Sequence, residues 1–200
     1  IEYESGEKDV ATTDKSWKTT EGEWRGNVIY AGDVIDARMS VEDWDNPSMD
    51  DSQYASAIEV EAPSALLLAQ RMEPIRVIET VNPKAFKKIS DRVYMYYFPA
   101  NMAGVTTLKV KGQAGTRIEV QHGEILKADS TLEVRNVNIY YRTGGDATFQ
   151  QDVYILRGDD CGEEFTPRFH YNGFQYVEVR ADRPVELDEN SLQAHFLSTD

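Results

Sequence analysis

The sequence predicts an all-β protein, an antiparallel β-sandwich with jelly-roll-like character, and three observations carry this prediction. Apolar and polar residues alternate with a period of two in several short segments. Turn signals that contain glycine or proline separate these segments. No stretch shows a convincing run of apolar residues at helical spacing. Many short strands joined by turns are typical of two packed antiparallel sheets.

The first expected elements lie in the N-terminal part of the chain. Residues 41–52 are polar and aspartate-rich, which is typical of a surface loop. Residues 58–61 alternate and predict a strand, and the apolar run at 65–69 suits a buried strand. Residues 75–79 predict another strand, and Asn-Pro-Lys at 82–84 then interrupts the pattern. We therefore place a domain boundary there, between residues 1–82 and 83–200.

A hairpin is the clearest local prediction. Residues 105–111 and 116–121 both alternate, and Gly-Gln-Ala-Gly lies between them. We predict that these two segments pair antiparallel. The residues expected in the core are Leu108, Val110, Ile118 and Val120. The other strands expected in this part of the chain are residues 93–98, 153–156, 173–179 and 192–196.

The charge balance excludes some partners. The chain has 35 acidic and 21 basic residues, a net charge of −14. A nucleic acid needs a basic surface, and so does an anionic membrane. The partner classes that the charge balance allows are a neutral sugar, a cation and a basic protein surface. Cys161 is the only cysteine, so no intrachain disulfide can form. The lack of disulfides does not identify the cellular compartment, and a secreted or periplasmic location is favoured over the cytoplasm.

A series of short phrases runs in order along the chain from about residue 17 to residue 200. They are Gly-Asp-Val-Ile-Asp-Ala-Arg at 32–38, Trp-Asp at 44–45, Glu-Pro-Ile-Arg-Val at 73–77, Phe-Pro-Ala-Asn-Met-Ala-Gly at 98–104, His-Gly-Glu-Ile-Leu at 122–126, Phe-Thr-Pro-Arg-Phe at 165–169 and Asn-Gly-Phe-Gln-Tyr-Val at 172–177. In this order the phrases resemble glycoside hydrolase family 78, the bacterial α-L-rhamnosidases. The sequence departs from that family's phrases at Asp33, Ile35, Pro99-Ala100 and Gln175.

The resemblance implies that accessory and catalytic domains follow one another along a longer polypeptide. Residues 1–82 would be the C-terminal part of a jelly-roll accessory module, so we expect thin packing there, with Val28, Ile29, Leu66 or Leu67 unusually exposed. Residues 83–200 would be the β-sandwich domain that precedes a helical (α/α) barrel, which performs inverting hydrolysis of terminal α-L-rhamnose. The core expected for this domain includes Phe98, Leu108, Phe169, Tyr176 and Phe196. The barrel's acidic signature, Glu-Arg-x-Gly-Trp-x-Gly-Asp, is absent from this sequence. The chain opens on Ile1, so we expect a processed or excised piece. We expect no catalytic residue in it.

Carboxylates in the family-like phrases are the first candidate site residues. An inverting glycosidase needs two of them about 6.5–9.5 Å apart. Asp33, Asp36, Arg38 and Trp44 are candidates for binding carbohydrate. A structural alternative is favoured for the carboxylates. In it, Asp36 caps a turn or pairs with Arg38, and Glu124 accepts hydrogen bonds at a strand end.

Calcium is the one cofactor left open. Asp43, Asp45 and Asp50 are candidate ligands, because hard cations take six to eight oxygen ligands. The spacing does not match an EF-hand, and a solvated acidic loop is the favoured alternative. The resemblance keeps calcium open, because some rhamnose-binding jelly rolls of that family use it.

Aromatic and histidine residues complete the candidates. Trp17, Trp24 and Trp44 could stack on the C–H face of a sugar, but packing is the favoured alternative. The three histidines, His122, His170 and His195, share no ligand spacing, so a zinc site is not expected.

Three functional hypotheses follow, and the first is favoured. The chain would be a non-catalytic region that supports the catalytic barrel of the same parent polypeptide and contributes to recognition of a rhamnose-containing glycan. The second is a carbohydrate-binding module, with or without calcium. The third is a complete enzyme with an unfamiliar site on a β-sandwich, and the missing barrel signature counts against it.

Overall fold

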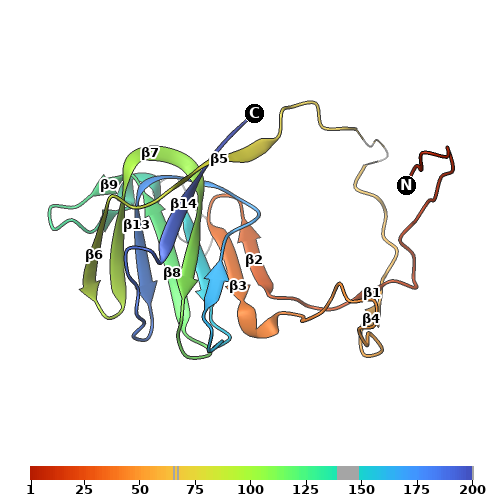
Figure 1. Cartoon of the computed structure of the whole chain (residues 1–200), viewed down its shortest axis with the longest axis horizontal. Coiled ribbons are helices and arrows are strands. Elements are labelled where there is room, and N and C mark those ends of the chain that lie inside the picture. The colour runs from red at the N-terminus through yellow and green to blue at the C-terminus, as the bar shows by residue number, and fades with distance from the viewer. Residues whose placement is uncertain (65, 67, 139–148, 200) are drawn as a thin grey trace. The chain divides into compact units, whose positions relative to one another are not determined.

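A computed structural model describes residues 1–64, 66, 68–138 and 149–199 in two compact units. The smaller unit comprises Ile1–Gly22 and Val41–Arg71. The strands found in its described part are β1 (Lys18–Thr19) and β4 (Ala55–Ser56), which pair antiparallel. The larger unit comprises Glu23–Ser40 and Met72–Asp200 and contains the main sheet (Figure 1). No helix in the described residues is long and apolar enough to cross a membrane.

The main sheet has ten strands in the order β2-β3-β11-β8-β13-β7-β14-β5, and β6 and β12 also pair with β7. These strands are β2 (Trp24–Val28), β3 (Gly32–Asp36), β5 (Ile75–Val81), β6 (Ala85–Ser90), β7 (Val93–Val110), β8 (Arg117–Gly123), β11 (Gln151–Ile155), β12 (Glu163–Phe165), β13 (Asn172–Ala181) and β14 (Leu192–Thr199). The shorter elements are η1 (Ala37–Met39), β9 (Ile125–Leu126), β10 (Leu132–Glu133) and α1 (Arg135–Asn138). All the pairings are antiparallel except that of β3 with β11.

Strand β7 folds the sheet into a sandwich because its two halves have different partners. Its first half pairs with β13 and β6, and its second half pairs with β14 and β12. One layer is therefore β2-β3-β11-β8-β13-β7-β6, and the other is β12-β7-β14-β5. Gly104 lies where β7 passes between them. A Cβ atom at this position would lie 2.2 Å from the carbonyl oxygen of His195, so only glycine fits this close approach.

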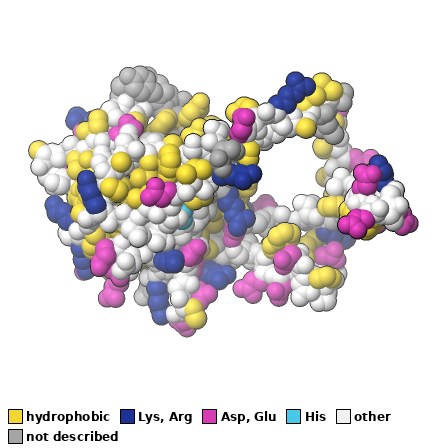
Figure 2. Space-filling view, turned by 45° about the horizontal axis from the view of Figure 1, so that its top comes forward, with side chains coloured by type: hydrophobic (Ala, Val, Ile, Leu, Met, Phe, Trp, Pro, Cys, Tyr) yellow, Lys and Arg dark blue, Asp and Glu magenta, His cyan; other side chains and the backbone are white. Residues whose placement is uncertain are grey.

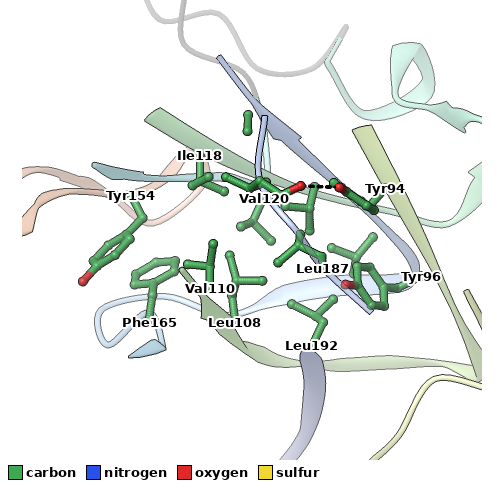
Figure 3. Packing of buried hydrophobic residues seen from close by; sticks show 14 of the residues in the cluster. Tyr94, Tyr96, Leu108, Val110, Ile118, Val120, Tyr154, Phe165, Leu187 and Leu192 are labelled. Atoms are coloured by element: carbon green, nitrogen blue, oxygen red, sulfur yellow. Dashed lines mark hydrogen bonds between the residues drawn. The ribbon is translucent and has the colours of Figure 1, made fainter. Parts of the chain in front are cut away.

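The core lies between the inward faces of the two layers (Figure 3). Alternate residues of each strand reach it, as a pleated sheet requires. Its fully buried members include Tyr94, Tyr96, Phe98, Leu108, Ile118, Leu156, Phe174, Val177, Val179, Leu192 and Ala194. The Tyr94 hydroxyl donates a hydrogen bond to the carbonyl oxygen of Val185, which satisfies a polar group that would otherwise be costly to bury.

The predicted hairpin is half right. Leu108, Val110, Ile118 and Val120 are all buried, as predicted. The predicted pairing is wrong, because β13 lies between β8 and β7, and the second half of β7 lies in the other layer. Alternation shows which side chains face the core. Two segments in opposite layers face the same core, so their patterns look like those of two paired strands.

The other strand predictions divide by unit. The segments expected at 75–79, 93–98, 173–179 and 192–196 lie within strands, and that at 153–156 overlaps β11. Residues 58–61 form no strand. A buried strand at 65–69 is also wrong for Leu66 and Leu68, which are exposed, and residues 65 and 67 lie outside the described part. The sheet in the described part of the smaller unit pairs β1 with β4 and includes no strand from this segment.

The side chains expected to be exposed in the first part of the chain are exposed, as the prediction of thin packing requires. Val28, Ile29 and Leu66 are exposed, and Phe98 and Leu108 are fully buried. Tyr176 and Phe196 are half-buried, and Phe169, also expected in the core, is 58% exposed, so the expectation for Phe169 is wrong. It lies in the turn between β12 and β13, outside the alternating strands. The domain boundary near residue 82 stays a prediction.

Candidate functional site

Asp33 is sealed into the larger unit at the start of β3. Its Oδ1 accepts a hydrogen bond from Asn27 Nδ2 at 3.0 Å, and its Oδ2 accepts one from the Arg168 backbone N–H at 3.0 Å. The Asp33 N–H in turn donates to Asp152 Oδ1 at 2.9 Å. Gly32 precedes it with φ +119, and a Cβ there would lie 2.4 Å from the Gln151 carbonyl oxygen. Gly32 therefore allows strand β3 to approach strand β11 closely.

Asp36 and Arg38 form a local pair at the end of β3. The Asp36 side chain caps η1 by accepting from the Arg38 N–H. The Arg38 guanidinium donates to both Asp36 oxygens, at 2.8 and 2.7 Å. The side-chain hydrogen bond from Arg38 lowers the pKa of Asp36. Glu124, just after β8, accepts from Asn101 Nδ2 at 2.7 Å. The contacts expected in the structural alternative are present for both Asp36 and Glu124.

A buried polar cluster lies beneath this region, inside the sandwich. His170 Nε2 lies 2.6 Å from Asp152 Oδ1, and both side chains are fully buried. His122 Nε2 lies 2.9 Å from the Thr106 hydroxyl, and His122 Nδ1 lies 3.3 Å from the Gln150 carbonyl oxygen. Because Thr106 is in the second half of β7 and His122 is in β8, this contact joins the two layers.

The two histidines of the cluster differ in how readily they take up a proton. Burial opposes protonation of His170, but the hydrogen bond and charge of Asp152 outweigh it and raise the pKa of His170. Burial is the main cause that lowers the pKa of His122, to about 4. A neutral His122 fits its neighbours in either tautomer. With the proton on Nδ1 the ring donates to the Gln150 carbonyl and Nε2 accepts from the Thr106 hydroxyl; with the proton on Nε2 it donates to that hydroxyl and Nδ1 accepts from Asn172 Nδ2 at 3.1 Å. Such a cluster specifies packing, and its burial gives a ligand no direct access.

Two atoms of the cluster lack a hydrogen bond within the described residues. They are Asp152 Oδ2 and His170 Nδ1, and both are buried. Asp152 Oδ2 lies 4.0 Å from His122 Nδ1, so it has an electrostatic neighbour beyond hydrogen-bond distance. No group of three or more His, Cys, Asp or Glu residues in the described chain could hold a metal ion.

The smaller unit carries the other sequence candidates. Trp44 is 73% exposed, and Asp43, Asp45 and Asp50 are exposed on the same loop. Asp43 has φ 54, in the left-handed region that aspartate tolerates better than most residues. The three aspartates are not gathered into a metal-binding group in the described structure. Roles for these residues in binding sugar or calcium stay predictions.

The tryptophans differ in their surroundings. Trp24 packs against the core, its ring meets that of Phe169 edge-on at 5.7 Å, and the Arg168 guanidinium lies 5.4 Å from its centroid. Packing is therefore what the structure shows for Trp24. Trp17 is 52% exposed, like Trp44 in the smaller unit.

Sequence reasoning missed the buried cluster, although a signal for it existed. Counting back by twos from Tyr154, which faces the core, places Asp152 on the same inward face. Counting forward from Val120 places His122 there as well. A carboxylate and an imidazole at inward positions need partners, since buried polar groups are rarely left unpaired.

Comparison with known proteins gives two matching family descriptions. The bacterial alpha-L-rhamnosidase concanavalin-like domain matches residues 87–198, and the alpha-L-rhamnosidase N-terminal domain matches residues 1–79.

Similar proteins match the chain over its whole length. An alpha-L-rhamnosidase of Formosa agariphila is 30% identical over 100% of this chain and 20% of its own length. The structure of alpha-L-rhamnosidase from Dictyoglumus thermophilum superimposes with a TM-score of 0.85 at 32% identity, over 100% of this chain and 21% of that one. The Streptomyces avermitilis enzyme, crystallised with L-rhamnose, superimposes with a TM-score of 0.82 at 26% identity, over 100% and 18%. The chain thus spans about a fifth of the length of its curated relatives.

Proposed function

Because this chain belongs to the bacterial α-L-rhamnosidase family, we propose that it is a non-catalytic β-sandwich region of a rhamnosidase. It supports a catalytic (α/α) barrel of the same polypeptide during hydrolysis of terminal α-L-rhamnose. One observation carries the proposal: similarity covers the whole chain and only about a fifth of each relative. A region that recurs as one part of a longer enzyme has the rest of that enzyme as its natural partner.

The state of the family-like carboxylates supports a non-catalytic role. Asp33, Asp36 and Glu124 each accept hydrogen bonds from their own chain. Inverting hydrolysis needs a carboxylic acid that protonates the leaving group and a carboxylate that activates water. Carboxylates held by arginine or by backbone N–H groups are fixed as acceptors, which suits a structural role.

Exposed apolar residues support a role in bracing another domain. Ile75, Val77 and Ile78 of β5 are 54%, 54% and 49% exposed. Figure 2 shows hydrophobic side chains on the surface of the larger unit, with acidic and basic ones among them. Apolar residues clustered on an edge strand favour contact with a further polypeptide surface.

Two measurements test the proposal. The 200-residue chain alone should release no product from an aryl α-L-rhamnoside above background, whereas the whole parent polypeptide should. Val77→Asp should lower the Tm and activity of the parent polypeptide, and Ile58→Asp, at a residue 84% exposed in the smaller unit, is the matched control. Turnover by the chain alone that disappears when one of its carboxylates is replaced would refute the proposal.

A second candidate function rests on Trp44. Its ring is exposed and its neighbours in the sequence are Asp43 and Asp45, and exposed aromatic rings are common platforms for a sugar. In this alternative the smaller unit binds a rhamnose-containing glycan, with or without calcium. Titration with L-rhamnose in the presence and absence of a chelator tests it. Binding that survives in Trp44→Ala excludes this candidate.

A further inference from the structure

A cavity on the outer face of the sandwich carries an inference that goes beyond the supporting role. The segment from β9 to α1, residues 125–138, folds over the outer face of β8 and β13 and forms a roof. The Tyr97 hydroxyl, on this face of β7, donates to the Ser130 carbonyl oxygen at 3.0 Å. Leu132 in the roof is 4% exposed and lies against Gly123, where an added Cβ would be 3.0 Å from it.

Met95 and Leu132 are buried apolar residues that do not belong to the sandwich core. Met95 alternates with the core residues Tyr94 and Tyr96 and therefore points to the outer face, yet it is fully buried. Leu132 is also buried outside the core cluster. These two apolar side chains are thus buried without belonging to the core cluster.

Between roof and sheet lies a cavity of about 470 Å³. Drug-sized and sugar-sized ligands occupy pockets of roughly 300–1,000 Å³. Its floor is polar, because neighbouring strands place Glu119 beside Arg180 and Gln121 beside Glu178. Gln151 of β11 lies beside Gln121 and extends the same row. The other lining residues are Ile89, Val93, Lys127, Thr131, Leu132, Val134 and Asn138.

The charges of this lining are balanced and largely paired. Two acidic residues, Glu119 and Glu178, face two basic ones, Lys127 and Arg180. Arg180 donates to Glu178 at 2.6 Å, and Arg117 donates to Glu119. Paired charges hold each other's side chains in place and present their remaining donors and acceptors to the cavity. Two carboxylates disfavour a phosphate, and the polar floor disfavours a wholly apolar ligand.

The remaining class of ligand is a neutral molecule that has hydroxyl groups on one side and C–H groups on the other. The hydroxyls match a floor on which the Glu carboxylates accept and the Arg180 guanidinium donates, while the Gln151 amide can do both. The Gln121 amide N–H groups already donate to backbone carbonyl oxygens, so its amide oxygen is what it offers to a ligand. The C–H groups match Ile89, Val93, Leu132 and Val134. We propose that this cavity binds one pyranose unit of a neutral sugar. The site differs from the candidate at Trp44, because all its lining residues belong to the larger unit.

Titration of the 200-residue chain with L-rhamnose, L-mannose and D-glucose, followed by NMR, tests the proposal. A single small ligand should bind with Kd on the order of 1 mM. Arg180→Gln and Thr131→Phe should each weaken binding at least about tenfold, the first by removing a donor and the second by filling the space. Arg183→Gln is the matched control, because Arg183 donates to the Ala114 carbonyl oxygen away from this cavity.

The outcomes separate this inference from the proposed function. The choice of L-rhamnose as a probe rests on the proposed function, so another pyranose that binds at the same residues still supports the site. The inference is overturned if none of the three sugars binds, or if Arg180→Gln and Thr131→Phe leave binding unchanged. It is also overturned if Trp44→Ala alone abolishes binding. Unchanged thermal unfolding of each variant shows that lost binding is not lost folding.

Discussion

Mild acid should destabilise the larger unit through His122. In the folded chain its pKa is lowered from 6.5 to about 4, mainly because the ring is completely buried. The unfolded state then binds the proton more readily than the folded state does. Stability from this group is complete above about pH 6.5 and is lost as the pH falls towards about 4. Each pKa unit corresponds to about 1.4 kcal/mol, so the loss is about 3 kcal/mol.

Between about pH 6.5 and pH 4, most of the change in the free energy of unfolding comes from His122 and not from its neighbours. The pKa of His170 is raised, so its contribution is complete below its unfolded value and is lost only as the pH rises through the folded value. The pKa of Asp36 is lowered from 3.8, so its contribution is lost in more acidic solution. For His122 itself, the nearby Asp152 carboxylate favours protonation and the positive charge of His170 opposes it, but burial is the largest effect and keeps the pKa of His122 low.

Urea unfolding at about pH 7 and about pH 4.5, followed by tryptophan fluorescence, measures the effect. In wild type the free energy of unfolding should fall by about 2 to 3 kcal/mol between these pH values. His122→Gln should be less stable near neutral pH, and its free energy of unfolding should change much less with pH. His195→Gln is the control, because that ring is only half-buried between Thr80 and Thr107. A fall in His122→Gln equal to that in wild type would refute the reasoning.

Two further predictions concern packing. Leu192→Ala, at a fully buried core position, should lower the free energy of unfolding by about 3 kcal/mol, whereas Leu66→Ala, 68% exposed, should change it by less than about 0.5 kcal/mol. Equal urea midpoints for the two variants would contradict the assigned core. Gly104→Ala should cost more than about 2 kcal/mol or prevent folding, because its Cβ would lie 2.2 Å from the His195 carbonyl oxygen. Gly22→Ala, with no atom within 4 Å of the added Cβ, is its control, and a normal Tm for Gly104→Ala would show that β7 can shift there.

Composition and alternation were enough to predict the fold class. Period-two patterns identified which residues of β7 and β8 are buried, because each side of a strand has one environment. The order of the short phrases indicated the family, and the family comparisons confirm it. These signals are local, or depend only on order along the chain, so a sequence displays them directly.

The partners of each strand were decided only by the tertiary structure. The 105–111 and 116–121 segments have the pattern of a hairpin, yet β13 arrives from residues 172–181 and lies beside both β8 and the first half of β7. Nothing in the local pattern distinguishes a partner in the same layer from one in the opposite layer. Both arrangements bury the same side chains.

The polar sites also required the folded chain. Asp152 and His170 are 18 residues apart in sequence, and His170 lies in a turn without alternation, so no spacing predicts their 2.6 Å contact. The outer cavity combines residues of five strands, β6, β7, β8, β11 and β13, with a roof from residues 125–138. The sequence determined which residues avoid water, because burial follows from each residue's own polarity and its position along a strand. Only the tertiary structure decided which polar groups meet, because that depends on contacts between segments far apart in the chain.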